Sequence, residues 1–171
     1  KAKEIDFDFA NSSEIFWADQ SSQDSAKELI LNTKNANDSL GATVLTIIKG
    51  APAGLGEVLY NKLDAALASA MMGINGVKGV EIGDGINVAT MLGSQNNDFM
   101  DKNGFKSNHC GGILGGISNG NDIVIKSYFK PTPSIFKAQP TINLDGNEVI
   151  CELRGRHDPC IGVRGSVVAT A

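Results

Sequence analysis

The 171-residue sequence lacks several features that would assign a protein quickly to a class. It contains no run of about 18 apolar residues, so we expect no transmembrane helix. No signal-peptide pattern opens the chain. Only three cysteines are present, Cys110, Cys151 and Cys160, and their odd number and irregular spacing argue against a secreted disulfide scaffold. These absences indicate a reducing compartment and therefore a cytoplasmic protein.

Positive charge is also scarce. Lys and Arg total 15 against 19 Asp and Glu, which gives a net charge of −4. This balance argues against general binding to nucleic acid or to an anionic membrane, although a local basic patch could still hold one anion. The first residue is Lys1 rather than Met, which indicates either a lost initiator or a fragment of a longer protein.

The composition that remains is that of an ordinary globular protein, 42% hydrophobic and 20% charged. The length suits one domain with a real core, which we place over residues 1–171.

Periodicity predicts helices over residues 21–38 and 58–74 and strands over 41–50 and 77–83. Apolar and acidic residues alternate over residues 5–9, which is typical of a strand.

The second half of the chain is richer in turns. Residues 93–112 are polar and flanked by glycine, which predicts a long loop. Asn119-Gly120 and Asp145-Gly146 each stand between apolar runs and predict the turns of two β-hairpins. A helix is indicated at "RGSVVATA". Because the order of elements is mixed rather than strictly βαβ, the predicted class is α+β.

Two glycine-rich stretches could bring the backbone close to a ligand. "GGILGGISNG" does not open a helix with G-x-G-x-x-G, so the dinucleotide-binding pattern does not apply. Its structural alternative is a tight, bulged hairpin. "GVKGVEIGDG" places Lys78, Glu81 and Asp84 in a glycine frame, and its alternative is a strand that ends in an Asp-Gly turn.

The segment "KPTPSI" follows a predicted strand. Lys130 and the hydroxyls of Thr132 and Ser134 suit a phosphate or a ring carbonyl. The alternative is a connection stiffened by its prolines.

The most distinctive motif is "RGRHDPC", residues 154–160. All three arginines of the chain lie within the eleven residues 154–164. Arg156 can hold a phosphate in a bidentate way. Asp158, near such cations, should stay ionised and can act as a base or orient one. The alternative is an Arg–Asp surface pair in a turn.

Two His–Cys combinations invite a zinc site, His109 with Cys110 and His157 with Cys160. The first pair is adjacent in sequence and no C-x-x-C is present, so we expect no metal site.

A set of blocks in register resembles the chorismate synthase family. They are "GLGE", "NKLDA", "GVKGVEIGDG", "GSQN", "SNHCGGILGGIS", "KPTPS" and "GRHDPC". The match runs from about Gly54 to the end, whereas residues 1–53 match weakly. The resemblance implies the C-terminal part of a β-α-β sandwich enzyme, with the N-terminal part, both catalytic histidines and the final helix absent. His109 and His157 are neither of those histidines.

The family's activity supplies the expected function. The resemblance implies anti 1,4-elimination of phosphate from 5-enolpyruvylshikimate 3-phosphate to give chorismate, with reduced FMN as cofactor and NADPH only as an external source of electrons. It also implies a homotetramer, with no nucleic-acid or membrane partner. A non-catalytic module that binds flavin or an anion, and a purely structural domain, are the alternatives.

The resemblance also implies site residues. Flavin contacts fall on Asn75, Gly76, Gly115, Lys130, Pro131, Thr132, Pro133, Ser134 and Arg156. Arg156 is also expected to meet the substrate, and Asp158 matches the aspartate implicated with the flavin in proton removal. Two departures are that Gly76 and Cys110 stand where relatives usually have Ala.

Overall fold

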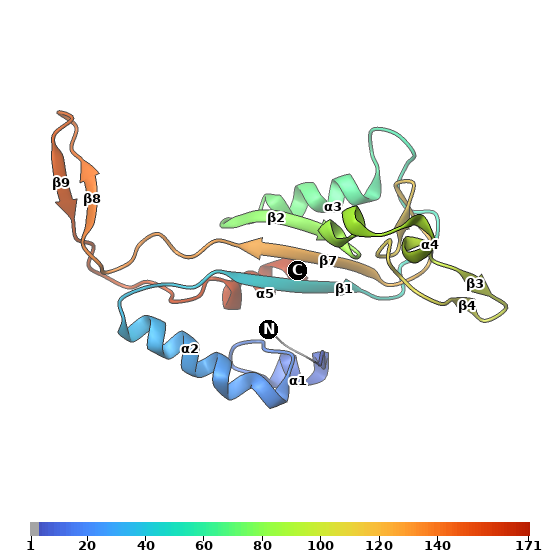
Figure 1. Cartoon of the computed structure of the whole chain (residues 1–171), viewed down its shortest axis with the longest axis horizontal. Helices are drawn as coiled ribbons and strands as arrows, with labels where there is room; N and C mark the ends of the chain where they lie inside the picture. The colour runs from blue at the N-terminus through green and yellow to red at the C-terminus, as the bar shows by residue number, and fades with distance from the viewer. Residues whose placement is uncertain (1–3) are drawn as a thin grey trace. The chain divides into compact units, whose positions relative to one another are not determined.

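Helices and antiparallel strands alternate irregularly along the chain, which confirms the α+β prediction (Figure 1). The computed structural model describes residues 4–171. They form two compact units: unit 1 comprises residues up to 42 together with 130–164, and unit 2 comprises 43–129 together with 165–171. Within the described residues, no helix is both long and apolar enough to cross a membrane.

Unit 1 is built from helices and one hairpin. Its elements are α1 (Phe7–Ser12), η1 (Gln20–Ser22), α2 (Gln23–Asn35), β8 (Gln139–Ile142), β9 (Glu148–Cys151) and the first turn of α5 (Gly162–Thr170). The helix predicted over 21–38 is therefore confirmed with shorter bounds. The hairpin predicted at Asp145-Gly146 is also confirmed, since β8 and β9 pair antiparallel around it.

The strand predicted over residues 5–9 is wrong, because α1 occupies most of it. The Asp6 side chain caps this helix by accepting a hydrogen bond from the Phe9 amide at 2.9 Å. The amide of Asp6 itself donates to the Ala18 carbonyl. The acidic residue that suggested an alternating strand thus acts as an N-cap, which a period-two pattern does not reveal.

Unit 2 holds the main sheet, in the strand order β1-β7-β2. Its longer elements are β1 (Ala42–Ile48), α3 (Leu63–Met72), β2 (Val77–Ile82), η2 (Gly85–Thr90) and β7 (Ile123–Phe129). Its short elements are α4 (Gly93–Asn96), β3 (Met100–Asp101), β4 (Gly104–Phe105), β5 (Ile113–Leu114) and β6 (Ile117–Ser118). The predicted strands over 41–50 and 77–83 are confirmed.

The core of unit 2 lies on one face of β7. Alternate residues of this strand, Ile123, Ile125, Ser127 and Phe129, are buried. Helix α3 packs against β2, and α5 lies against β7, where a methyl group added at Gly165 would come within 2.5 Å of the Phe129 ring (Figure 1). Glycine at 165 is therefore what lets α5 approach the sheet.

The helix predicted over 58–74 begins later, at Leu63. The Leu63 amide donates to the Gly116 carbonyl at 2.8 Å, so the β5–β6 hairpin supplies an acceptor for one of the free amides of the first turn. The preceding residues include Tyr60 at φ +65°, which is outside the helical region.

The hairpin predicted to turn at Asn119-Gly120 is also wrong, because β6 and β7 pair with other strands. The turn lies instead at Gly115-Gly116, where both residues have positive φ, as two-residue hairpin turns require. This is the tight hairpin that stood as the structural alternative for the glycine-rich stretch. The predicted long loop over 93–112 contains α4 and the small β3–β4 hairpin.

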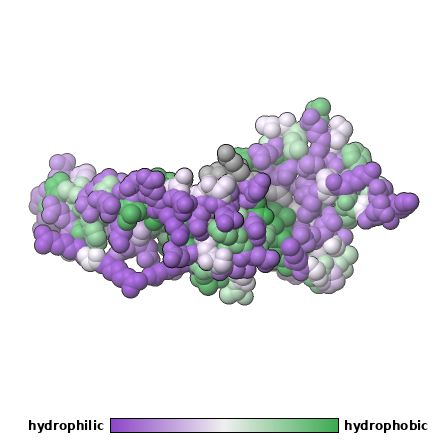
Figure 2. All heavy atoms as spheres, turned by 90° about the horizontal axis from the view of Figure 1, so that it is seen from below, coloured by the Kyte–Doolittle hydropathy of each residue, from purple (hydrophilic) through white to green (hydrophobic). Residues whose placement is uncertain are grey.

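Hydrophilic residues cover most of the face shown in Figure 2, with hydrophobic residues in separate groups. The hairpin β8–β9 nevertheless exposes large apolar side chains, among them Ile142, Leu144 and Ile150.

Candidate active site

The residues that follow α2 hold the proline-rich segment 130–136 within unit 1. The Ser39 hydroxyl donates to the Thr132 carbonyl at 2.7 Å, and the Phe136 amide donates to the Asn37 carbonyl at 3.2 Å. These two bonds attach the segment at both of its ends.

The same stretch of chain also holds the "GRHDPC" motif. The Leu40 amide donates to the Pro159 carbonyl at 2.7 Å, and Leu40 forms a parallel bridge with Cys160. Unit 1 therefore brings together, around residues 37–40, two motifs that the sequence separates by about twenty residues.

Direct contact between the two motifs comes from a pair of rings. Phe136 and His157 are stacked, with centroids 4.4 Å apart and planes 21° from parallel. The stack fixes the orientation of the His157 imidazole beside the segment that carries Thr132.

Two polar atoms at this junction are buried without a partner. They are Nε2 of His157 and Oγ1 of Thr132, one from each motif. Buried polar atoms in native proteins are nearly always hydrogen-bonded, so each exception calls for an explanation, such as a ligand or an ordered water that completes the bonding. These two atoms are available to pair with polar atoms of a bound ligand.

Positive charge at the junction is also uncompensated. Within residues 4–171, Lys130, Arg154 and Arg156 make no ion pair, and all three are exposed. By contrast, the Asp158 carboxylate forms an ion pair with Nε of Arg164, 3.2 Å away. The motif thus combines one oriented carboxylate with cations that are free to meet an anion.

A cleft of about 360 Å³ opens beside the stacked rings. It is lined by Phe136, Glu152, Leu153, Arg154 and Gly155. Phe136 and Leu153 give the cleft an apolar part, and Glu152 and Arg154 give it charges of both signs.

The flavin contacts implied by resemblance are divided between the units. Lys130–Ser134 and Arg156 belong to unit 1, whereas Asn75, Gly76 and Gly115 belong to unit 2. Asn75 and Gly76 follow the C-terminal end of α3, and the Gly115 turn is bonded to its first residue. A ten-residue helix is about 15 Å long, so within unit 2 the pair Asn75–Gly76 and the turn at Gly115 lie at opposite ends of α3.

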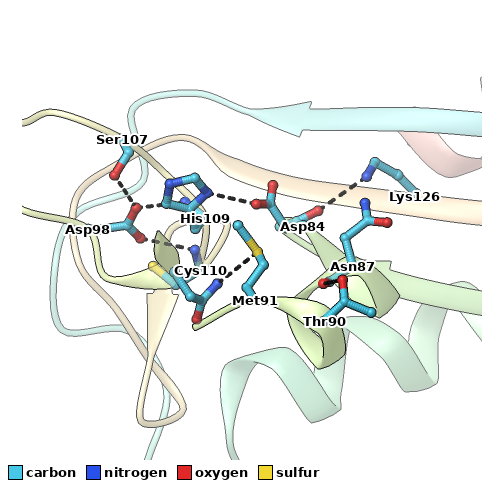
Figure 3. A network of polar contacts seen from close by, with 11 residues as sticks. Asp84, Asn87, Thr90, Met91, Asp98, Ser107, His109, Cys110 and Lys126 are labelled. Atoms are coloured by element: carbon cyan, nitrogen blue, oxygen red, sulfur yellow. Dashed lines mark hydrogen bonds and ion pairs between the residues drawn. The ribbon is translucent and has the colours of Figure 1, made fainter. Parts of the chain in front are cut away.

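Unit 2 contains a second polar cluster, drawn in Figure 3. Nδ1 of His109 lies 2.7 Å from the Asp84 carboxylate. Asp98 accepts from the Ser107 hydroxyl at 2.7 Å, from the His109 amide at 2.7 Å and from the Cys110 amide at 3.0 Å. The cluster therefore closes the segment 98–110 into a fixed loop.

Electrostatics in this cluster favour a structural role. Burial alone would raise the pKa of Asp98, but hydrogen bonds from Cys110, Ser107 and His109 outweigh it and hold that pKa well below its usual range. Burial, reinforced by the neighbouring Asp98 charge, raises the pKa of the Cys110 thiol. The thiol is therefore kept protonated and unreactive.

No group of three His, Cys, Asp or Glu side chains gathers closely enough for a metal ion anywhere in the described part of the chain.

Sequence reasoning missed two parts of the junction. It gave no role to residues 37–40, because they contact the motifs through backbone groups and one hydroxyl. It also set His157 aside, although its position between Arg156 and Asp158 was the available signal.

Comparison with known proteins follows the sequence motifs. A chorismate synthase family model matches residues 2–171. Chorismate synthase of Campylobacter fetus subsp. fetus is 72% identical over 171 residues, which is 100% of this chain and 48% of that protein. The Helicobacter hepaticus enzyme is 57% identical over 169 residues, 99% of this chain and 47% of that protein. The chain thus spans about half the length of the curated relatives it matches.

A solved structure described as chorismate synthase superposes with a TM-score of 0.70 at 34% identity. The superposition covers 74% of this chain and 40% of that one. Sequence and fold agree, and the chain belongs to the chorismate synthase family.

Proposed function

We propose that the protein containing this chain converts 5-enolpyruvylshikimate 3-phosphate to chorismate. The reaction is an anti 1,4-elimination: the C6–H bond and the C3–O bond break, the ring gains a second double bond, and phosphate leaves with the electron pair of the C3–O bond. No net oxidation occurs. The observation that supports this proposal is the junction in unit 1, where the two motifs that carry exposed cations, the Asp158 carboxylate and two unsatisfied polar atoms are held against one another.

The phosphate leaving group sets the first requirement. Charge that develops on the departing oxygen must be stabilised by fixed cations. Arg156 is proposed for this task because its guanidinium can bind a phosphate in a bidentate way and forms no ion pair within residues 4–171. Lys130 adds a second exposed positive charge within the same unit.

Proton removal sets the second requirement. Asp158 is proposed as the acid–base partner, with Arg164 holding one carboxylate oxygen at 3.2 Å. The ion pair engages one carboxylate oxygen, and the other oxygen is proposed to accept the proton.

Reduced FMN is the proposed cofactor, with NADPH only as an external reductant. When bound, it supplies electron density to the carbon that loses phosphate. Thr132 Oγ1 and His157 Nε2 fit such a group, because both are buried hydrogen-bonding atoms without partners. Asn75, Gly76, Gly115, Lys130, Pro131, Thr132, Pro133, Ser134 and Arg156 are the proposed flavin contacts.

Further properties are proposed from family membership: a cytoplasmic homotetramer that acts on a small-molecule substrate. The 171-residue chain alone is expected to be inactive, because it spans about half of its relatives.

The test is a turnover assay on the full-length protein. Purified protein, substrate and chemically reduced FMN are mixed without oxygen, and chorismate formation and phosphate release are followed together. Equal amounts of both products support the proposal. Saturable FMN binding without product from fresh substrate would instead identify a flavin-binding module.

A further inference from the structure

We propose that His157 is an additional flavin-positioning residue, whose Nε2 is reserved for a hydrogen bond to the bound cofactor. The inference rests on the proposed function and adds a residue to its site. Four observations carry it: the buried and unpaired nitrogen, the ring stack, the neighbouring cleft, and the contrast with the other histidine.

The first observation is the unsatisfied atom. Nε2 of His157 is buried and has no partner among the described residues. A buried polar atom that is bonded neither to water nor to protein destabilises the folded state. We therefore expect a ligand or another group to pair with this nitrogen.

The second observation is that the imidazole cannot turn freely to find another partner. Its face lies on the Phe136 ring, with centroids 4.4 Å apart. Phe136 is in turn attached to Asn37 through its amide. The stack therefore restricts the plane of the imidazole, which limits the directions in which Nε2 can point.

The third observation is the cleft of about 360 Å³, which shares the Phe136 ring with the stack. Arg154 and Gly155 also line it, and Gly155, at φ +138°, has no atom within 4 Å of an added Cβ. The surroundings thus combine an aromatic ring, a guanidinium and the Glu152 carboxylate at an open surface, which leaves room for one end of a planar ligand.

The fourth observation is that His109 behaves differently. Its Nδ1 is paired with Asp84 at 2.7 Å, and its amide is bonded to Asp98. The unpaired ring nitrogen is therefore particular to His157 and is not a feature that the two histidines share.

The decisive variant is His157→Phe in the full-length protein, with His109→Phe as the matched control. Phe keeps an aromatic ring against Phe136 and removes only the hydrogen-bonding atoms. Two quantities are measured: the Tm without ligand, and the Kd for FMN from quenching of flavin fluorescence.

The proposal expects a distinctive pair of results for His157→Phe. The Tm without ligand stays equal or rises, because an unsatisfied buried atom is removed. The Kd for FMN rises by roughly tenfold, the usual effect of losing one directed hydrogen bond. For His109→Phe the Tm falls, because a paired histidine is lost.

Two results would overturn the proposal. A lower Tm for unliganded His157→Phe would mean that Nε2 is already paired inside the full-length protein. An unchanged Kd would mean that the nitrogen does not meet the flavin. Failure of the proposed function is separate, since it would appear as wild-type protein that does not bind FMN at all.

Discussion

The two polar clusters of the molecule contrast in how fully their hydrogen bonds are satisfied. In unit 2, Asp98 accepts hydrogen bonds from three groups of one loop, and His109 is paired with Asp84. In unit 1, among residues 4–171, Thr132 Oγ1 and His157 Nε2 have no hydrogen-bond partner, and the exposed side chains of Arg154 and Arg156 form no ion pair. Both clusters contain an acid and a histidine, so residue types alone do not separate them.

We propose that this difference distinguishes a structural network in unit 2 from a ligand site in unit 1. A satisfied network stabilises a loop and gains nothing from an added molecule. An unsatisfied one costs stability until a ligand completes it. Family membership points the same way, since the implied contacts at Thr132 and Arg156 fall in the unsatisfied cluster, whereas Asp84, Asp98 and His109 are not among them.

The largest effect is expected from Asp158→Asn in the full-length protein. Loss of an acid–base group should lower kcat by about 10²- to 10⁴-fold and leave the Kd for FMN within roughly threefold. Parallel stopped assays and fluorescence titrations measure the two quantities. Asp145→Asn, at the exposed hairpin turn, serves as the control and should change neither. Equal loss of turnover and binding in Asp158→Asn would make that carboxylate structural.

The next effect belongs to the satisfied cluster. Asp98→Asn should lower the free energy of unfolding at neutral pH by about 2 kcal/mol, because an ionised acceptor of several hydrogen bonds becomes neutral. The folded pKa of Asp98 is lowered, so its contribution is present above the unfolded value near 4 and is lost as the pH falls below it. The difference between wild type and variant should therefore shrink as the pH is lowered from about 5 to 3.

Urea unfolding across this pH range measures the effect. Asp101→Asn is the matched control, since Asp101 lies on the same loop and its carboxylate is a 3.4 Å partner of the exposed Lys106. A difference for Asp98→Asn that does not depend on pH would contradict the role assigned to its charge.

Arg156→Lys tests whether ligand binding depends on the planar shape of the Arg156 guanidinium as well as on its charge. Lys keeps the charge but loses the planar fork, so the Kd for FMN or for the substrate should rise by about tenfold. Stability should not change, because Arg156 makes no ion pair within residues 4–171. An unchanged Kd would make Arg156 an ordinary solvated side chain.

Much of the fold was predictable from the sequence, and the rest of the fold and the candidate site depend on long-range contacts. The α+β class, the strands around 44 and 80 and the Asp145-Gly146 turn follow from local patterns. The helix at 7–12 and the late start of α3 do not, because an aspartate cap and the Gly116 carbonyl decide them. Likewise, the motifs could be named from sequence, but their junction depends on residues 37–40, which carry no distinctive side-chain chemistry.

The smallest effect on stability and on FMN binding is expected from Ser39→Ala, which tests how the junction between the two motifs is held together. Its hydroxyl donates to the Thr132 carbonyl at 2.7 Å, so removal should lower the free energy of unfolding by about 1 kcal/mol. The Kd for FMN should rise only a few-fold, since Phe136 and Pro159 keep their own bonds to the same stretch. Asp38→Asn is the adjacent control: its carboxylate meets Lys137 and the Ser39 amide at an exposed site, where ion pairs contribute little. A larger effect from Asp38→Asn than from Ser39→Ala would mean that charge, rather than the hydroxyl bridge, keeps Thr132 in place beside the unsatisfied histidine.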